Sequence, residues 1–157
     1  MKLNFLILEG KAPAWVESAR REYQAKISPF IKFEITSLKS PSADRDSLEV
    51  KRRLEGALIL KQLSPKDMLI LFDEHGKLAK TSEAFASTVA QVLESGKQQV
   101  VLCIGGPYGF AEEVKKRAQS TWSLSPLTMN HWLAQLVALE QVYRAFTISK
   151  GIPYHNR

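Results

Sequence analysis

The stretch Val100–Phe110, VVLCIGGPYGF, is an apolar run that breaks into a turn containing three glycines. A continuous apolar run of this kind suits a strand that is covered on both faces of a parallel sheet. Glycines directly after such a strand allow a ligand to approach the main chain, because no Cβ atom stands in the way. The stretch therefore predicts a buried strand that ends either in a ligand site or in a tight structural turn.

Strand and helix patterns alternate on both sides of this stretch. Strands are predicted at Lys2–Leu8, Phe30–Leu38, Asp67–Phe72 and Gln99–Ile104, with a short extended segment at Trp122–Ser125. Helices are predicted after Pro13, after the capping residues Ser47 and Thr81, over Phe110–Ser120, and from about Asn130 to Ile148. This alternation predicts an α/β fold, with a mostly parallel sheet, helices on both faces and a single domain over residues 1–157.

Three segments carry more specific expectations. Asp73–Lys77 is predicted to be a turn at the carboxyl end of the third strand. In the second helix, Leu54, Ala57, Leu58 and Leu63 are predicted to form the buried side, while Lys51, Arg52 and Arg53 are interpreted as a solvated face rather than as phosphate contacts. The last helix is apolar around most of its circumference, which indicates burial on several sides and hence a partner subunit.

The composition narrows the function classes. The net charge of +6 and the pI near 9.5 favour a polyanionic partner, nucleic acid first. No apolar run approaches the roughly 20 residues that span a bilayer, and the single cysteine, Cys103, is expected to be a buried thiol. We therefore expect a cytoplasmic protein without a membrane segment. With one cysteine and three histidines far apart in the sequence, no metal site is expected.

Several short motifs together point to a family. They are Ile104–Phe110 (IGGPYGF), Ser123-Leu124-Ser125 with Leu127-Thr128, His131, Glu140–Ala145 (EQVYRA) and Pro153-Tyr154-His155. The opening Met-Lys-Leu, Leu71-Phe72-Asp73, Gly76-Lys77 and the length fit as well, so the similarity covers the whole chain. On these motifs the sequence resembles the ribosomal RNA large subunit methyltransferase H family of the SPOUT superfamily.

The resemblance implies a SPOUT-type α/β fold with a C-terminal trefoil knot, a homodimer, and S-adenosylmethionine bound in the knot by main-chain groups of three loops. In this chain those loops contain Phe72, the pair Gly105 and Gly106, and the run Leu124, Ser125, Pro126, Leu127, Thr128 and Met129. The implied substrate is a pseudouridine of 23S rRNA within the ribosome, and the implied product is N3-methylpseudouridine.

The C-terminal tail is expected to complete the site. The ring nitrogen of the substrate must lose a proton, and a histidine exchanges protons near neutral pH, so His155 is predicted to be catalytic together with Tyr154, which would stack on or hydrogen-bond the base. Arg144, Lys150 and Arg157 are predicted to contact RNA phosphates. We expect the tail of one subunit to act in the site of the other; the alternative from composition alone is a frayed terminus without function.

One position departs from the family pattern. Gln135 stands where the family usually has an arginine, and it lacks the fixed charge and the bidentate fork of a guanidinium. If that arginine contacts RNA or the partner subunit, affinity or dimer geometry would differ here. Two alternatives to the rRNA enzyme stay open: a non-catalytic ribosome- or RNA-binding module of the same fold, and a SPOUT methyltransferase acting on another RNA, such as tRNA.

Overall fold

The computed structural model of this protein describes residues 1–156, and Arg157 lies outside the described residues. Five strands alternate with five helices in this part of the chain. In order they are β1 (Lys2–Leu8), α1 (Ala14–Ile27), β2 (Lys32–Leu38), α2 (Leu48–Lys61), β3 (Met68–Leu78), α3 (Ser82–Leu93), β4 (Gln99–Ile104), α4 (Glu112–Arg117), β5 (Ser120–Ser123) and α5 (His131–Ser149).

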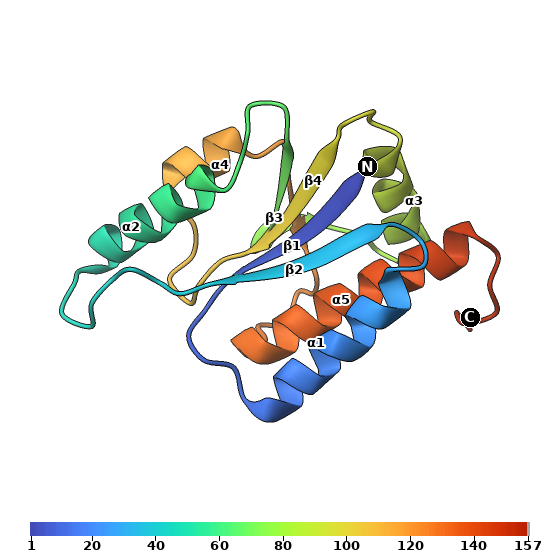
Figure 1. Cartoon of the computed structure of the whole chain (residues 1–157), viewed down its shortest axis with the longest axis horizontal. Helices are drawn as coiled ribbons and strands as arrows, with labels where there is room; N and C mark the ends of the chain where they lie inside the picture. Colours follow the sequence, from blue (N-terminus) through green and yellow to red (C-terminus); the bar gives the residue numbers. More distant parts are fainter. Residues whose placement is uncertain (157) are drawn as a thin grey trace.

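The strands form one parallel sheet in the order β2-β1-β4-β3-β5, which confirms the predicted α/β class (Figure 1). β4 lies in the middle, where Cys103 pairs with Leu6 of β1 on one side and with Leu71 of β3 on the other. All of β4 from Val100 to Ile104 is buried. The apolar run of the sequence is therefore the central strand, and the glycine turn leaves the sheet at its carboxyl edge.

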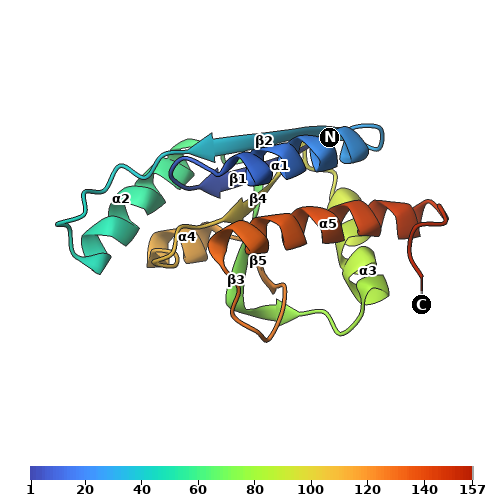
Figure 2. The same ribbon diagram turned by 90° about the horizontal axis from the view of Figure 1, so that it is seen from below.

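Helices cover both faces of the sheet, as predicted (Figures 1 and 2). α1, α3 and α5 pack on one face, where Ile27, Phe85 and Leu139 join the core. α2 and α4 pack on the other, where Ile59 and Val114 meet Cys103. Cys103 is fully buried, and this burial raises the pKa of its thiol, so the expected buried thiol is confirmed.

Side-chain caps set the starts of two helices where the sequence placed them. Ser47 Oγ accepts a hydrogen bond from Val50 N at 3.2 Å at the start of α2, and Thr81 Oγ1 accepts one from Ala84 N at 3.1 Å at the start of α3. Each cap satisfies an amide of the first turn that has no partner within the helix.

The predicted turn at Asp73–Lys77 is wrong, because β3 continues to Leu78. Phe72 pairs with Trp122 of β5, and Lys77 pairs with the same residue after a register shift, so residues 73–76 bulge out of the ladder. Gly76 allows β3 to resume its pairing with β5 after the bulge, since a Cβ there would lie 2.7 Å from the carbonyl carbons of Thr121 and Trp122. The bulge holds Asp73 and Glu74 at the carboxyl edge of the sheet.

The predicted buried side of α2 is also wrong in part. Ala57 is exposed, whereas Glu55, Gly56 and Ile59 are the buried residues of this helix. A Cβ on Gly56 would come within 3.1 Å of Ala111 Cβ, so the absence of a side chain lets α2 approach the segment before α4 closely. Glu55, the residue before Gly56, is buried at the same place on α2.

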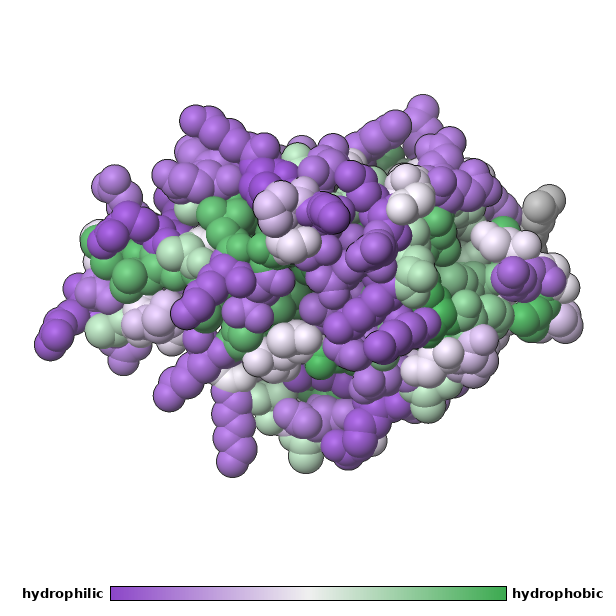
Figure 3. Space-filling view, turned by 45° about the horizontal axis from the view of Figure 1, so that its top comes forward, coloured by the Kyte–Doolittle hydropathy of each residue, from purple (hydrophilic) through white to green (hydrophobic). Residues whose placement is uncertain are grey.

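α4 is shorter than the predicted Phe110–Ser120 helix, because the chain turns extended at Ala118 to enter β5. The face shown in Figure 3 is mostly hydrophilic, with apolar groups gathered towards both ends. No helix within residues 1–156 is both long enough and apolar enough to cross a bilayer. The knot implied by the resemblance concerns chain threading and stays a prediction.

Candidate cofactor pocket and C-terminal tail

A pocket of about 260 Å³ lies over the carboxyl ends of β3, β4 and β5; we call it the turn pocket. Three segments far apart in the sequence line it: the end of β3, the glycine turn after β4 and the loop after β5. Its lining residues are Phe72, Asp73, Glu74, Ile104, Gly105, Gly106, Pro107, Gly109, Phe110, Ser123, Leu124, Ser125, Leu127, Thr128 and Met129. All the residues predicted to hold the cofactor are among them except Pro126.

The glycine turn leaves no room for a side chain at Gly105 or Gly106. A Cβ on Gly105 would lie 2.9 Å from Cε1 of Phe110, and one on Gly106 would collide with the Glu55 carboxylate. Gly109 has a φ of 79°, which glycine adopts without strain. The turn therefore offers main-chain N–H and C=O groups, rather than side chains, as the wall of the pocket.

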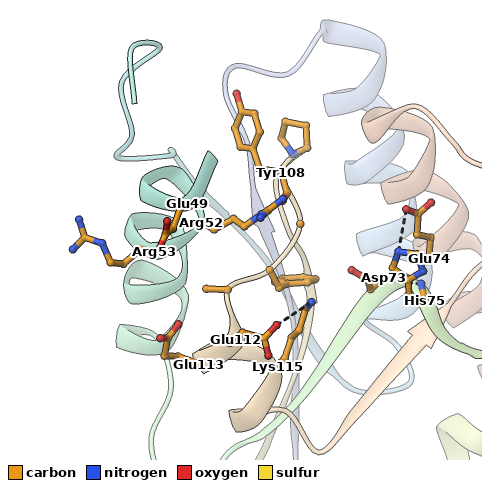
Figure 4. Close-up of a pocket in the computed structure, with 14 residues that line it drawn as sticks. Glu49, Arg52, Arg53, Asp73, Glu74, His75, Tyr108, Glu112, Glu113 and Lys115 are labelled. Carbon is orange, nitrogen blue, oxygen red and sulfur yellow. Dashed lines mark hydrogen bonds and ion pairs between the residues drawn. The ribbon is translucent and has the colours of Figure 1, made fainter. Parts of the chain in front are cut away.

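Helix α2 supports the turn from behind. Lys51 Nζ lies 4.6 Å from the centre of the Tyr108 ring, and Arg52 Nε donates a hydrogen bond to the Tyr108 carbonyl at 2.5 Å. These two cations, interpreted from the sequence as solvated, thus contact the turn, while Arg53 points away from it (Figure 4). No local pattern in the sequence predicts this contact, because Arg52 and Tyr108 are 56 residues apart.

A larger hollow of about 600 Å³ adjoins the turn pocket between α2, α4 and the β3 bulge (Figure 4). The two hollows share Asp73, Glu74, Pro107, Gly109 and Phe110. The residues that line the larger one carry both signs of charge: Arg52, Arg53 and Lys115 together with Glu49, Glu112 and Glu113. Asp73 lies across this space from α2, at the boundary between the hollows.

The loop after β5 is held by its own polar groups. Ser123 Oγ donates to the Ser125 carbonyl at 3.1 Å, and Ser125 Oγ accepts from Leu127 N at 2.9 Å. Asn130 Oδ1 accepts from Trp132 N at 2.8 Å and so caps α5 directly after the loop. These short-range bonds fix a loop whose Leu127 side chain is 74% exposed.

The C-terminal tail folds back onto α5. Tyr154 Oη donates to Glu140 Oε1 at 2.9 Å, and the Tyr154 ring meets that of Tyr143 edge-on, with ring centres 4.8 Å apart. Arg144 lies 4.8 Å from the centre of the Tyr154 ring and pairs with Glu140, as the i,i+4 spacing predicted. Burial and the hydrogen bond to Glu140 raise the pKa of the Tyr154 hydroxyl.

His155 is held through both ring nitrogens. Arg144 Nη1 lies 3.0 Å from Nδ1, and since a guanidinium has no acceptor, Nδ1 must accept this bond. Nε2 lies 3.1 Å from Glu83 Oε1 on α3, so Nε2 carries the proton and donates it. Neither nitrogen of this tautomer has a free lone pair. Arg144, predicted to contact RNA, is occupied with Glu140 and His155, whereas Lys150 is exposed.

Within the described chain, no tail residue lines the turn pocket. The loop after β5 leads into the start of α5, while the tail lies at the other end of this helix (Figure 2). Between His131 and Arg144 the helix rises by about 20 Å. One chain alone therefore keeps the predicted catalytic residues, Tyr154 and His155, apart from the predicted cofactor residues.

Gln135 is fully buried and belongs to a polar network inside the protein. Its side chain bonds to Arg20, to Glu9 at 2.9 Å and to His131 at 3.0 Å, and Arg20 forms a buried ion pair with Glu9. Burial lowers the pKa of His131. Gln135 thus points into the protein interior in this fold, and the guanidinium that contacts it is that of Arg20 on α1.

Residues 1–156 contain no group of three or more His, Cys, Asp or Glu side chains arranged to hold a metal ion.

The chain matches the family model described as "Predicted SPOUT methyltransferase" over residues 1–155. It is 45% identical to ribosomal RNA large subunit methyltransferase H of Bdellovibrio bacteriovorus over 156 residues, which cover 99% of each chain. It is 38% identical to the protein of the same name from Trichlorobacter lovleyi over 99% of this chain and 100% of that one. The identity with the same-named protein of Syntrophotalea carbinolica is 34%, over the full length of both. With its parallel sheet and its pocket at the carboxyl edge, the chain belongs to the SPOUT methyltransferase family.

Proposed function

We propose that this protein is an S-adenosylmethionine-dependent methyltransferase that modifies N3 of a pseudouridine in 23S rRNA on the ribosome. The observation that carries the proposal is the meeting of three segments in the turn pocket, with glycine main chain as one wall. The names of the full-length relatives support ribosomal RNA as the substrate class, and the net charge of +6 favours such a polyanion.

The turn pocket fits the cofactor in its chemistry. Main-chain groups of Gly105 and Gly106 and of the Leu124–Met129 loop would hydrogen-bond the adenine edge, and Phe72, Ile104 and Leu124 offer apolar surface for its ring. Bound there, S-adenosylmethionine would supply an activated methyl group on a sulfonium. The protein's part is then to hold the target nitrogen in line with that methyl and to accept the nitrogen's proton.

A homodimer would bring the tail to this pocket. The outer side of α5 carries Trp132, Leu136 and Val137 half-buried and Leu133 49% exposed, next to the exposed Leu127. This is more apolar surface than a helix normally presents to water. If a second copy covers it, Tyr154 and His155 of one subunit can lie at the turn pocket of the other. The dimer would then bring together the catalytic and cofactor residues that are far apart within one chain.

Substrate assignment is tested by methyl transfer from labelled S-adenosylmethionine to assembled ribosomes, free rRNA and tRNA in parallel, followed by nucleoside analysis. We expect N3-methylpseudouridine from ribosomes and none from tRNA, because the names of the full-length relatives point to ribosomal RNA as the substrate. Strong methylation of tRNA would overturn the substrate assignment. Cofactor binding without transfer to any RNA would identify a binding module instead.

The role of the tail is tested by mixing two inactive variants. One lacks residues 151–157, and the other, Gly105→Val, has its turn blocked by the Phe110 ring. If the tail acts across the dimer, mixed dimers contain one complete site, and activity returns to about a quarter of the wild-type rate after subunit exchange. If the mixture stays inactive while mixed dimers form, the tail acts within its own chain.

A further inference from the structure

The turn pocket is acidic in a basic protein. Its charged lining residues are Asp73 and Glu74, and within the described chain no lysine, arginine or histidine lines it, although the protein carries a net charge of +6. Glu74 is exposed and therefore largely screened by solvent. Asp73 is half-buried, and its Oδ1 accepts a hydrogen bond from His75 N at 2.9 Å, which holds the carboxylate at the pocket edge.

A second carboxylate lies directly behind the pocket wall. Glu55 of α2 is 3% exposed, and its side chain touches Gly106, the residue whose main chain forms that wall. Among residues 1–156, Glu55 Oε2 is buried without a hydrogen-bond partner. The nearby cation is Lys51, one helical turn earlier, which is itself engaged with the Tyr108 ring.

This placement is costly for the fold. A carboxylate oxygen removed from water without a hydrogen-bond partner, as Glu55 Oε2 is, destabilises the native state, and burial raises the pKa of Glu55. Gly56, next to it, packs closely on Ala111, so α2 lies near the glycine turn and Glu55 lies against Gly106. A residue kept at such a cost beside a ligand pocket is a candidate for a role towards the ligand.

We propose that Glu55, together with Asp73, makes the turn pocket selective for a positively charged sulfonium ligand over the uncharged thioether that remains after methyl transfer. The proposal rests on the proposed function in taking S-adenosylmethionine as the ligand. The Glu55 carboxylate would attract the sulfonium electrostatically from behind Gly106, without touching the ligand. Glu55 is therefore a positioning residue and not a catalytic one. Selectivity of this kind would hold the cofactor and release the product.

The physical reason is that the two ligands differ in little besides charge. S-adenosylmethionine and S-adenosylhomocysteine share the adenosine and amino-acid groups, so hydrogen bonds of the glycine turn serve both equally. Only the sulfonium gains from nearby carboxylates, and this gain is large where water is excluded. A buried carboxylate such as Glu55 is screened much less than the exposed Glu74.

The experiment measures dissociation constants of both ligands by calorimetry for the wild-type protein, Glu55→Gln, Asp73→Asn and the double variant. Glu94→Gln is the matched control, because Glu94 is an exposed acid at the end of α3 that does not line the pocket. We expect the wild type and the control to prefer S-adenosylmethionine. Each pocket variant should lose about three- to tenfold of that preference, with the affinity for S-adenosylhomocysteine nearly unchanged.

Equal weakening of both ligands by Glu55→Gln would overturn the proposal, because it would mark a purely structural support of the turn. An unchanged ratio in the double variant would overturn it as well. Failure of the proposed function is distinguishable: in that case the wild type binds neither ligand. A thermal melt of each variant verifies folding, and Glu55→Gln, which removes an unpaired buried charge, is not expected to lower the melting temperature.

Discussion

Arg144 donates a hydrogen bond to Nδ1 of His155 at 3.0 Å and at the same time pairs with Glu140 on its own helix. Because an arginine side chain offers only donors, this bond fixes His155 as the tautomer with its proton on Nε2. The tail is thus held in one orientation by a residue that sequence reasoning assigned to phosphate. Before His155 could accept a proton at Nδ1, its hydrogen bond from Arg144 would have to break.

Arg144→Met is therefore expected to loosen the tail and to lower methyl transfer to ribosomes by about ten- to hundredfold, the equivalent of losing charge-assisted hydrogen bonds. Binding of S-adenosylmethionine should change little, because Arg144 does not line the turn pocket. Nitrogen-15 spectra of the histidine rings should show His155 as one tautomer in the wild type and as a mixture in the variant. Unaltered spectra with full activity would contradict this role.

The buried ion pair between Glu9 and Arg20 gives a prediction about stability. Both side chains are almost inaccessible, and Gln135 bonds to both. Arg20→Met leaves the Glu9 charge buried without its partner and is expected to cost about 3–5 kcal/mol of unfolding free energy, measured by urea denaturation. The double variant Glu9→Gln/Arg20→Met should recover at least half of that loss. If it is no more stable than the single variant, the pairing is not what holds α1 to the sheet.

The sequence predicted the order of elements and the central strand well, because these follow from periodicity and capping. The apolar run of β4 and the caps Ser47 and Thr81 are local signals. It failed where contacts across the sheet decide the outcome. β3 continues past Phe72 because β5 pairs with it twice, and no pattern within β3 carries that information.

The candidate site divides in the same way. The three cofactor segments were predicted from the resemblance to the family, and the fold places them around one pocket. Glu55 and the Arg20 network were missed, because a charged residue inside an amphipathic helix is normally interpreted as solvated. Gly56 was the available signal for the burial of Glu55. A glycine within a helix indicates close packing at that position, and Glu55 is its neighbour in the chain.

Gly76 offers a sharp test of the β3 bulge. A Cβ at this position would lie 2.7 Å from main-chain carbons of Thr121 and Trp122. These two residues belong to β5 and cannot move without breaking its pairing with β3. Gly76→Ala is expected to destabilise the protein by about 1–3 kcal/mol and to weaken cofactor binding, since β5 leads into the Leu124–Met129 loop. Gly10→Ala is the matched control: no atom lies within 4 Å of its added Cβ, so its melting temperature should stay close to that of the wild type.

The buried carboxyl of Glu55 predicts how stability depends on pH. Burial raises the pKa of this group in the folded protein above its ordinary value of 4.5. Between these two pKa values the folded state binds more protons than the unfolded state, so this contribution to stability is complete below pH 4.5 and is lost as the pH rises through the folded pKa. Each unit of difference between the folded and unfolded pKa values corresponds to about 1.4 kcal/mol of unfolding free energy.

Glu55→Gln cannot ionise and should escape that loss. We therefore expect this variant to be more stable than the wild type at neutral pH and equally stable near pH 4, as measured by urea denaturation across this range. Glu94→Gln serves as the control, because it makes the same chemical change at an exposed acid away from the turn pocket. A Glu55→Gln variant that is less stable at neutral pH would mean that the carboxylate is paired in solution. A Glu55→Gln variant that is more stable and also loses its preference for the sulfonium ligand would show that Glu55 lowers fold stability while it raises ligand selectivity.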